Sequence, residues 1–192
     1  MNSRCIYRIL VNRIFTHPTA QTKYKNEFDI DDDKWNNIYI RPFKSCSEVK
    51  LRMFQYKINV NCLMTNKKLY RMKIIDSDMC SFCNNNTEDM KHLFWDCNYV
   101  NTFWNDFSDW YKQYFNDDID LNYKLILFGV GSDPLVNLCF ILMKRVIYTS
   151  KFKKQTPSFV HFKYLVLKLP KPLNNIATHL YHHSVFLQSS FI

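Results

Sequence analysis

Apolar and polar residues follow one another along most of this chain with the spacing of amphipathic helices. Residues 3–15 place their apolar side chains on one helix face, and His17-Pro18 is expected to end that helix. The acidic run at residues 29–33 suits a second helix start, because negative charge is favoured at a helix N-terminus. Arg41-Pro42 is expected to close this second helical segment.

Two further helices are predicted before the middle of the chain. Ser47 and Cys62 bracket the first, which directs apolar residues inward and leaves lysine and arginine outside. Thr65 fits the N-cap of a second, short and basic helix over residues 66–74. A cysteine-rich loop follows this pair of helices.

An aromatic stripe dominates the second half of the chain. Its members recur in steps of four and three; such a stripe could stack nucleic-acid bases, but core packing is its commoner cause. Residues 121–128 fit either a short helix or a strand. Pro134 suits the start of a long helix that runs into residues 151–154, and Pro157 starts a last one that reaches Leu169. The stripe consists of Val100, Trp104, Phe107, Tyr111 and Tyr114.

Composition agrees with a mainly α fold. The chain of 192 residues contains only two glycines and six prolines, too few for the tight turns of a β-sandwich or a dinucleotide-binding sheet. Nearly half of the residues are apolar, so a real core can form. We therefore expect a small, irregular helical domain.

The net charge of +9 indicates what kind of partner the protein binds and says little about its fold. Basic tracts at residues 44–73 and 144–171 are separated by an acidic block, and together they could form one face for a polyanion. The alternative is a pair of solvated helix faces.

No secretory signal is visible, and the apolar segment 135–148 is interrupted by Lys144 and Arg145, so we expect neither secretion nor a membrane partner. An intracellular location, nuclear or cytoplasmic, would keep the seven cysteines reduced.

The sharpest chemical signal lies in the cysteine-rich loop. Cys80 and Cys83 are separated by two residues, which lets one tight turn direct two thiolates at the same point. His92 and Cys97 supply a second pair, and the four side chains form a closed set of three sulfurs and one nitrogen. This set predicts one structural Zn²⁺ with no position for a catalytic water. The two cysteines alone could instead be a redox pair or buried thiols.

The spacing within the second pair carries a geometric prediction. Residues five apart lie about 140° around an α-helix, so His92 and Cys97 cannot share one face of a regular helix. We expect the helix to be broken or tightened near Cys97.

The remaining cysteines occupy apolar segments and are expected to be buried fillers, namely Cys5, Cys46, Cys62 and Cys139. The expected boundaries are residues 1–170 for the helical zinc-binding domain, with the CCHC zinc-knuckle-like loop at 80–97, and 171–192 for a poorly patterned tail.

The cysteine–histidine block resembles the zinc-binding domain that follows the reverse transcriptase in LINE-type (non-LTR) retrotransposon proteins. The similarity extends from Ile6 to about Leu169, although the Glu-Thr pair of that family stands here in reversed order as Thr87-Glu88. The resemblance implies metal ligands at the four residues above and a role beside the polymerase in binding RNA or DNA. It implies no catalysis, and the chain reads as a fragment of a decayed or co-opted element. The block comprises Lys67, Leu69, Tyr70, Ile75-Asp76, Cys80-Ser81-Phe82-Cys83, Glu88, His92-Leu93-Phe94-Trp95-Asp96-Cys97 and Phe103-Trp104.

Two functions remain open at this point. The first is a non-catalytic nucleic-acid-binding accessory module whose cations contact the phosphate backbone. The second is a structural or protein-interaction module that docks on a reverse transcriptase domain, and exposed apolar surface around residues 104–114 would favour it. An enzyme is not expected, because no nucleophile and base grouping is visible, and neither is a small-molecule substrate. The candidate phosphate contacts are Arg52, Lys57, Lys67, Lys68, Arg71, Lys73, Lys151, Lys153 and Lys154.

Overall fold

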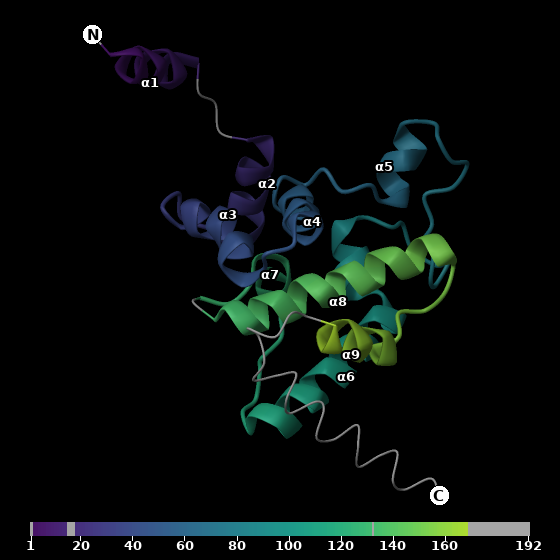
Figure 1. Ribbon diagram of the computed structural model, residues 1–192. Helices are drawn as coiled ribbons and strands as arrows, with labels where there is room; N and C mark the ends of the chain where they lie inside the picture. The colour runs from purple at the N-terminus through teal and green to yellow at the C-terminus, as the bar shows by residue number, and fades with distance from the viewer. Residues whose placement is uncertain (1, 15–17, 132, 169–192) are drawn as a thin grey trace, which may run out of the picture.

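The computed structural model describes residues 2–14, 18–131 and 133–168, and these are mainly helical (Figure 1). Apart from one β-bridge between Met79 and Thr87, no strand occurs within these ranges. The prediction of a mainly α fold is confirmed. The elements are α1 (Ser3–Ile14), α2 (Thr19–Phe28), α3 (Lys34–Ser45), α4 (Val49–Asn59), α5 (Asn66–Arg71), η1 (His92–Asp96), α6 (Asn98–Phe115), α7 (Tyr123–Phe128), α8 (Pro134–Lys153) and α9 (Phe159–Leu167).

The long helix α8 lies across the middle of the molecule (Figure 1). It begins at Pro134 as predicted, and the Asp133 carboxylate caps it by accepting hydrogen bonds from the backbone N–H groups of Leu135 and Val136. Helix α8 contacts the N-terminal helices α3 and α4, and it also contacts η1 and α9. It therefore joins the N-terminal helices to the cysteine-rich region.

The aromatic stripe of α6 is part of the core. Trp104 and Phe107 are buried, and both rings pack against Phe140 of α8 at centroid distances of 5.9 and 5.7 Å. Phe107 and Trp110 also contact Phe162 of α9. Core packing of this stripe is confirmed: Val100, Trp104 and Phe107 are buried and so not available to bases, and Tyr111 and Tyr114 are partly buried against the same core. Their burial also weakens the interaction-module reading that an exposed stripe would have favoured.

The N-terminal third differs from the prediction in three ways. The apolar residues Val49, Met53 and Tyr56 of α4, predicted to point inward, are exposed, because α4 packs through the neighbouring face that carries Leu51, Phe54 and Ile58. Helix α2 was not expected, and Pro42 does not close the second segment, because α3 runs through it to Ser45. Proline has no N–H to donate to the carbonyl four residues earlier, here that of Ile38. The amide of Asn59 on α4 donates to this Ile38 carbonyl instead, at 3.4 Å. A side chain from a neighbouring helix thus replaces the lost backbone bond.

The ambiguous apolar segment at 121–128 forms α7, whose C-terminal carbonyls are bound by basic side chains. The Lys144 ammonium donates to the carbonyls of Ile126 and Leu127 at 2.7 and 3.0 Å, and to the Gln55 side chain at 2.6 Å. The Arg41 guanidinium donates to the Phe128 carbonyl. Cations are favoured at a helix C-terminus. Lys144 is fully buried, and its desolvation holds its pKa well below the usual lysine range.

The other cysteines divide equally between interior and surface. Cys46 and Cys139 are buried as predicted, whereas Cys5 and Cys62 are exposed, so the prediction is wrong for these two. Cys5 lies on α1, which stands apart from the other helices (Figure 1), and no other described helix packs on the apolar face of α1, where Ile6, Ile9 and Leu10 are exposed. Within the described ranges, no helix combines the length and the apolarity that crossing a membrane requires. The predicted tail, residues 171–192, lies outside the described residues.

Candidate metal centre

A short turn positions the first two cysteines. The backbone N–H of Cys80 donates to Asn86 at 2.8 Å, and the N–H of Asn84 donates back to Cys80 at 3.0 Å, beside the Met79–Thr87 bridge. Asn84 takes a positive φ of 53°, which asparagine tolerates better than most residues. The chain therefore reverses tightly and brings both thiols to the same side.

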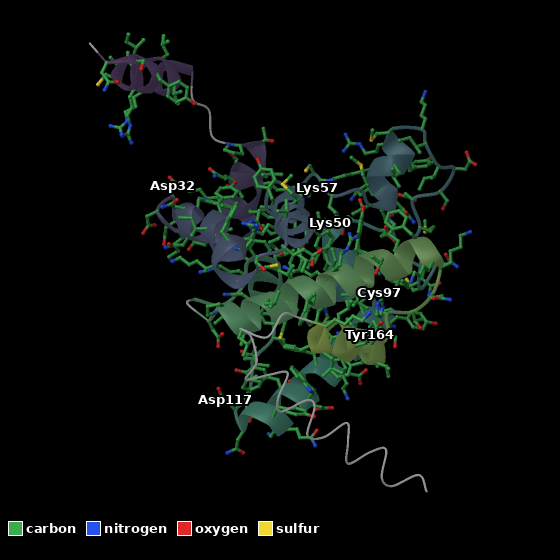
Figure 2. All side chains as sticks on the ribbon, in the orientation of Figure 1. Asp32, Lys50, Lys57, Cys97, Asp117 and Tyr164 are labelled. Carbon is green, nitrogen blue, oxygen red and sulfur yellow. The ribbon has the colours of Figure 1, made fainter. Side chains whose placement is uncertain are left out.

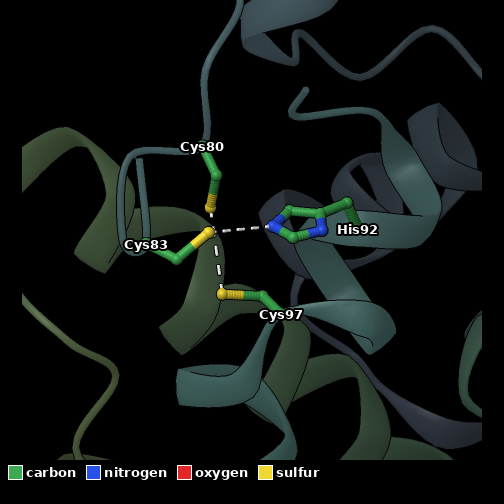
Figure 3. A group of neighbouring side chains, drawn as sticks. All are labelled: Cys80, Cys83, His92 and Cys97. Atoms are coloured by element: carbon green, nitrogen blue, oxygen red, sulfur yellow. Dashed lines mark hydrogen bonds between the residues drawn. The ribbon is translucent and has the colours of Figure 1, made fainter. Parts of the chain in front are cut away.

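All four predicted ligands converge on one point, as Figure 3 shows. Their ligand atoms all lie within 4.8 Å of one another. The Cys80 and Cys97 sulfurs are 3.8 Å apart, and the Cys83 sulfur is 3.3 Å from Nε2 of His92. Thiolates about 2.3 Å from a tetrahedral zinc lie roughly 3.8 Å apart, and a thiolate and an imidazole nitrogen lie roughly 3.5 Å apart. The cluster thus has the size and donor set for one Zn²⁺.

The second ligand pair sits on an unusual turn. Residues 92–96 form a π-helical turn, closed by a hydrogen bond of 3.2 Å from the Cys97 N–H to the His92 carbonyl. A bond between residues five apart brings them over one another, which a regular α-helix does not. Cys97 itself is extended, and α6 starts afresh after it. The predicted distortion at Cys97 is confirmed, although the turn is widened and not tightened.

The sulfurs of Cys80 and Cys97 also contact each other directly. The Cys80 thiol donates to the Cys97 sulfur, and this bond together with burial raises the pKa of Cys80. The same hydrogen bond lowers the pKa of Cys97. Zinc binds thiolates, so Cys80, Cys83 and Cys97 would each release a proton on binding it.

A buried glutamate anchors the metal loop to the rest of the fold. Glu88 is fully buried and forms an ion pair with Lys151 of α8, which is also buried. Its carboxylate also accepts hydrogen bonds from the N–H and hydroxyl of Ser81, between the two cysteines, and from the N–H of Asn66 at the start of α5. One carboxylate therefore ties the cysteine turn, α5 and α8 together. Sequence reasoning noted Glu88 only within the family block, and nothing local indicated its partner 63 residues away.

The predicted phosphate contacts occupy different environments. The prediction is wrong for Lys151, because its ammonium is buried against Glu88 and also donates to the Met64 carbonyl. Lys68 is half-buried and donates to backbone carbonyls of residues 61 and 63, while Arg52 donates to Ser47 and lies over the ring of Phe43. Lys67 forms a surface ion pair with Asp89. The exposed members without an ion pair among the described residues are Lys57, Arg71, Lys73, Lys153 and Lys154.

Figure 2 marks Lys57 and Lys50 on α4, whereas Lys153 and Lys154 follow Lys151 at the end of α8. Because Lys151 binds Glu88 and the carbonyl of Met64, that end of α8 lies beside the metal loop and the entry to α5. The structure thus gathers Lys153 and Lys154 near this region and leaves Lys57 on a separate helix.

Comparison with known proteins gives one family. Neither the curated proteins nor the solved structures contain a significant match to this chain. A family model described as zinc-binding in reverse transcriptase matches residues 9–104, half of the chain, and this segment contains the four converging ligands. With the geometry of the cluster, this match shows that the chain belongs to the reverse transcriptase zinc-binding family.

Proposed function

We propose that this chain is a non-catalytic accessory domain that binds one structural Zn²⁺ and contacts the phosphates of RNA or DNA. The observation that carries the proposal is the convergence of Cys80, Cys83, His92 and Cys97 at zinc-like separations inside the matched family segment. Four protein ligands fill a tetrahedral site, so the metal would cross-link the cysteine turn to η1 without activating water.

The metal part is tested by metal analysis of the purified protein. We expect one zinc per chain, and loss of that zinc in Cys83→Ser and His92→Ala. Cys62→Ser is the matched control, because Cys62 is an exposed thiol outside the cluster. Zinc content below one equivalent in the native protein, or full content in both ligand variants, would refute this assignment.

The nucleic-acid part follows from the charge distribution. With a formal charge of +9 and exposed cations on α4, α5 and the end of α8, the domain presents groups that bind phosphates mainly by charge. Binding of this type weakens steeply as salt rises and shows little sequence preference. We further propose that the domain originates from a non-LTR, LINE-type element, because the order of its motifs resembles those proteins.

A salt series with short RNA and DNA tests the nucleic-acid part. Lys153→Ala/Lys154→Ala should weaken binding and reduce its salt dependence. Lys25→Ala/Lys34→Ala removes the same charge from a region where both lysines are paired with aspartates, and it should have a much smaller effect. Absent or salt-insensitive binding by the folded, zinc-loaded protein would overturn this part of the proposal.

A second function is favoured by an exposed apolar stripe on α4. Val49, Met53 and Tyr56 share one helix face and are about half-exposed or more. Such a stripe suits docking on a reverse transcriptase domain. Calorimetric titration against such a domain separates the two functions: docking should be lost in Met53→Asp and kept in Lys153→Ala/Lys154→Ala.

A further inference from the structure

An open hollow of about 420 Å³ lies where α5 turns into the metal loop. It is lined by Tyr70, Arg71, Lys73, Ile75 and Asp76. The backbone beneath it is fixed, because the N–H of Ile74 donates to Leu69 and the N–H of Lys73 donates to Tyr70, with Lys73 at a φ of 56°. The backbone that carries the lining residues is therefore held in place.

Most side chains that line this hollow form no polar or aromatic contact with the rest of the described structure. Among the described residues, no hydrogen bond, ion pair or ring contact involves the side chains of Tyr70, Arg71, Lys73 or Asp76. Some other exposed rings are partly covered by neighbouring cations, such as Phe43 under Arg52 and Tyr164 under Lys168. Tyr70 is 49% exposed and has no such cover. No residue of α5 is buried, and about half of the Tyr70 surface is open to solvent.

An aromatic face beside two cations matches one ligand chemistry, that of a nucleotide. Bases stack on aromatic side chains, while lysine and arginine bind the phosphate that follows. Asp76 would repel a phosphate but can accept hydrogen bonds from the amino group of a base. In a double helix the faces of the bases are already stacked on one another, so only an unpaired base can lie on Tyr70.

We propose that this hollow binds an unpaired nucleotide of single-stranded RNA or DNA, with the base on Tyr70 and the phosphate at Arg71 and Lys73. The inference rests on the proposed nucleic-acid binding and adds a preference for single strands. It also assigns separate tasks to the lining residues. Tyr70 selects for unpaired bases, while Arg71 and Lys73 supply affinity that depends on salt.

Fluorescence anisotropy with the full, zinc-loaded chain tests this inference. Labelled single strands of RNA and DNA are compared with a duplex of the same length across a salt series. Tyr70→Ala should weaken single-strand binding by about 5- to 150-fold, leave duplex binding unchanged and keep the salt slope. Arg71→Ala/Lys73→Ala should lower the salt slope by about 1 to 2 for single strands. A selective loss with either RNA or DNA supports the inference and identifies the strand.

Tyr99→Ala is the matched control, because Tyr99 is also 49% exposed but lies at the start of α6 and does not line the hollow. Circular dichroism and zinc content confirm that each variant is folded. If Tyr70→Ala and Tyr99→Ala behave alike while the native protein shows salt-dependent binding, the inference falls and the proposed function stands. If the native protein binds no strand even at low salt, both fall.

Discussion

Breaking the buried ion pair between Glu88 and Lys151 should strongly destabilise the protein. Both side chains are almost completely buried, at 0% and 3% relative exposure. Removing one partner of a buried pair costs about 3–5 kcal/mol, because the remaining charge is left in a low-dielectric interior. A domain is commonly stable by about 5–15 kcal/mol, so either single variant would lose a large part of its free energy of unfolding.

Two conservative variants separate the contributions. In Lys151→Met the Glu88 carboxylate keeps three donors, the N–H of Asn66 and the N–H and hydroxyl of Ser81. In Glu88→Gln the side chain keeps its shape, but its NH₂ group faces donors and the Lys151 ammonium loses its counter-ion. We expect Glu88→Gln to cost at least as much as Lys151→Met. Because the double variant leaves no buried charge, it should be less destabilised than the sum of the two by about 0.5–3 kcal/mol.

Urea unfolding followed by circular dichroism measures these free energies on the zinc-loaded protein. The control is Lys67→Met, the same substitution in the ion pair with Asp89, whose side chains are 49% and 45% exposed. An exposed pair of this kind contributes about 0–1 kcal/mol. The pair does not anchor the metal loop if the single variants lose no more free energy of unfolding than Lys67→Met does. Strictly additive losses in the double variant would lead to the same conclusion. Zinc affinity should fall roughly 10- to 100-fold in Glu88→Gln, as for other groups that support metal ligands.

Three further predictions concern other parts of the fold. Gly129→Ala should destabilise by about 1–3 kcal/mol in urea unfolding, because Gly129 has a φ of 84° and a Cβ would lie 2.1 Å from the Asn137 side-chain oxygen; an unchanged midpoint would contradict this reading. The lowered pKa of buried Lys144 means that the unfolded chain binds more protons between that pKa and the ordinary lysine value near 10.5. Stability should therefore rise with pH over this window relative to Lys144→Met, and parallel pH profiles of the two proteins would contradict the burial of a titrating amine. Thiol labelling of the zinc-loaded protein should modify Cys5 and Cys62 quickly, and chelation should add Cys80, Cys83 and Cys97; early labelling of the cluster with zinc bound would argue against metal ligation.

Local spacing was enough to predict the metal cluster. Cys80 and Cys83 are brought together by a turn of a few residues, and the five-residue step from His92 to Cys97 predicted that the helix must be distorted there. The widening of that turn could not be predicted, because it depends on which backbone bond replaces the regular one. The mainly helical fold and the burial of the α6 stripe also follow from periodicity alone.

Interactions between distant segments account for the errors. Pro42 reads as a helix end, yet Asn59 of another helix binds the carbonyl that proline leaves free. Lys144 and Lys151 read as members of a solvated basic tract, yet both are buried, one on the carbonyls of α7 and the other on Glu88. A charge count cannot distinguish such lysines from exposed ones, because their partners lie on other elements of the fold.

The central position of α8 has a consequence for how the protein is made and dissected. The matched family segment ends at residue 104, inside α6, but α8 supplies both the ring that covers Trp104 and the lysine that neutralises Glu88. A recombinant fragment cut at the family boundary would carry all four ligands and still lack the surface on which they are held. During synthesis, the metal loop would likewise leave the ribosome well before Lys151, so a stable cluster is expected to form only after α8 has emerged. The segment that matches the family is thus shorter than the segment that must fold to hold the metal site.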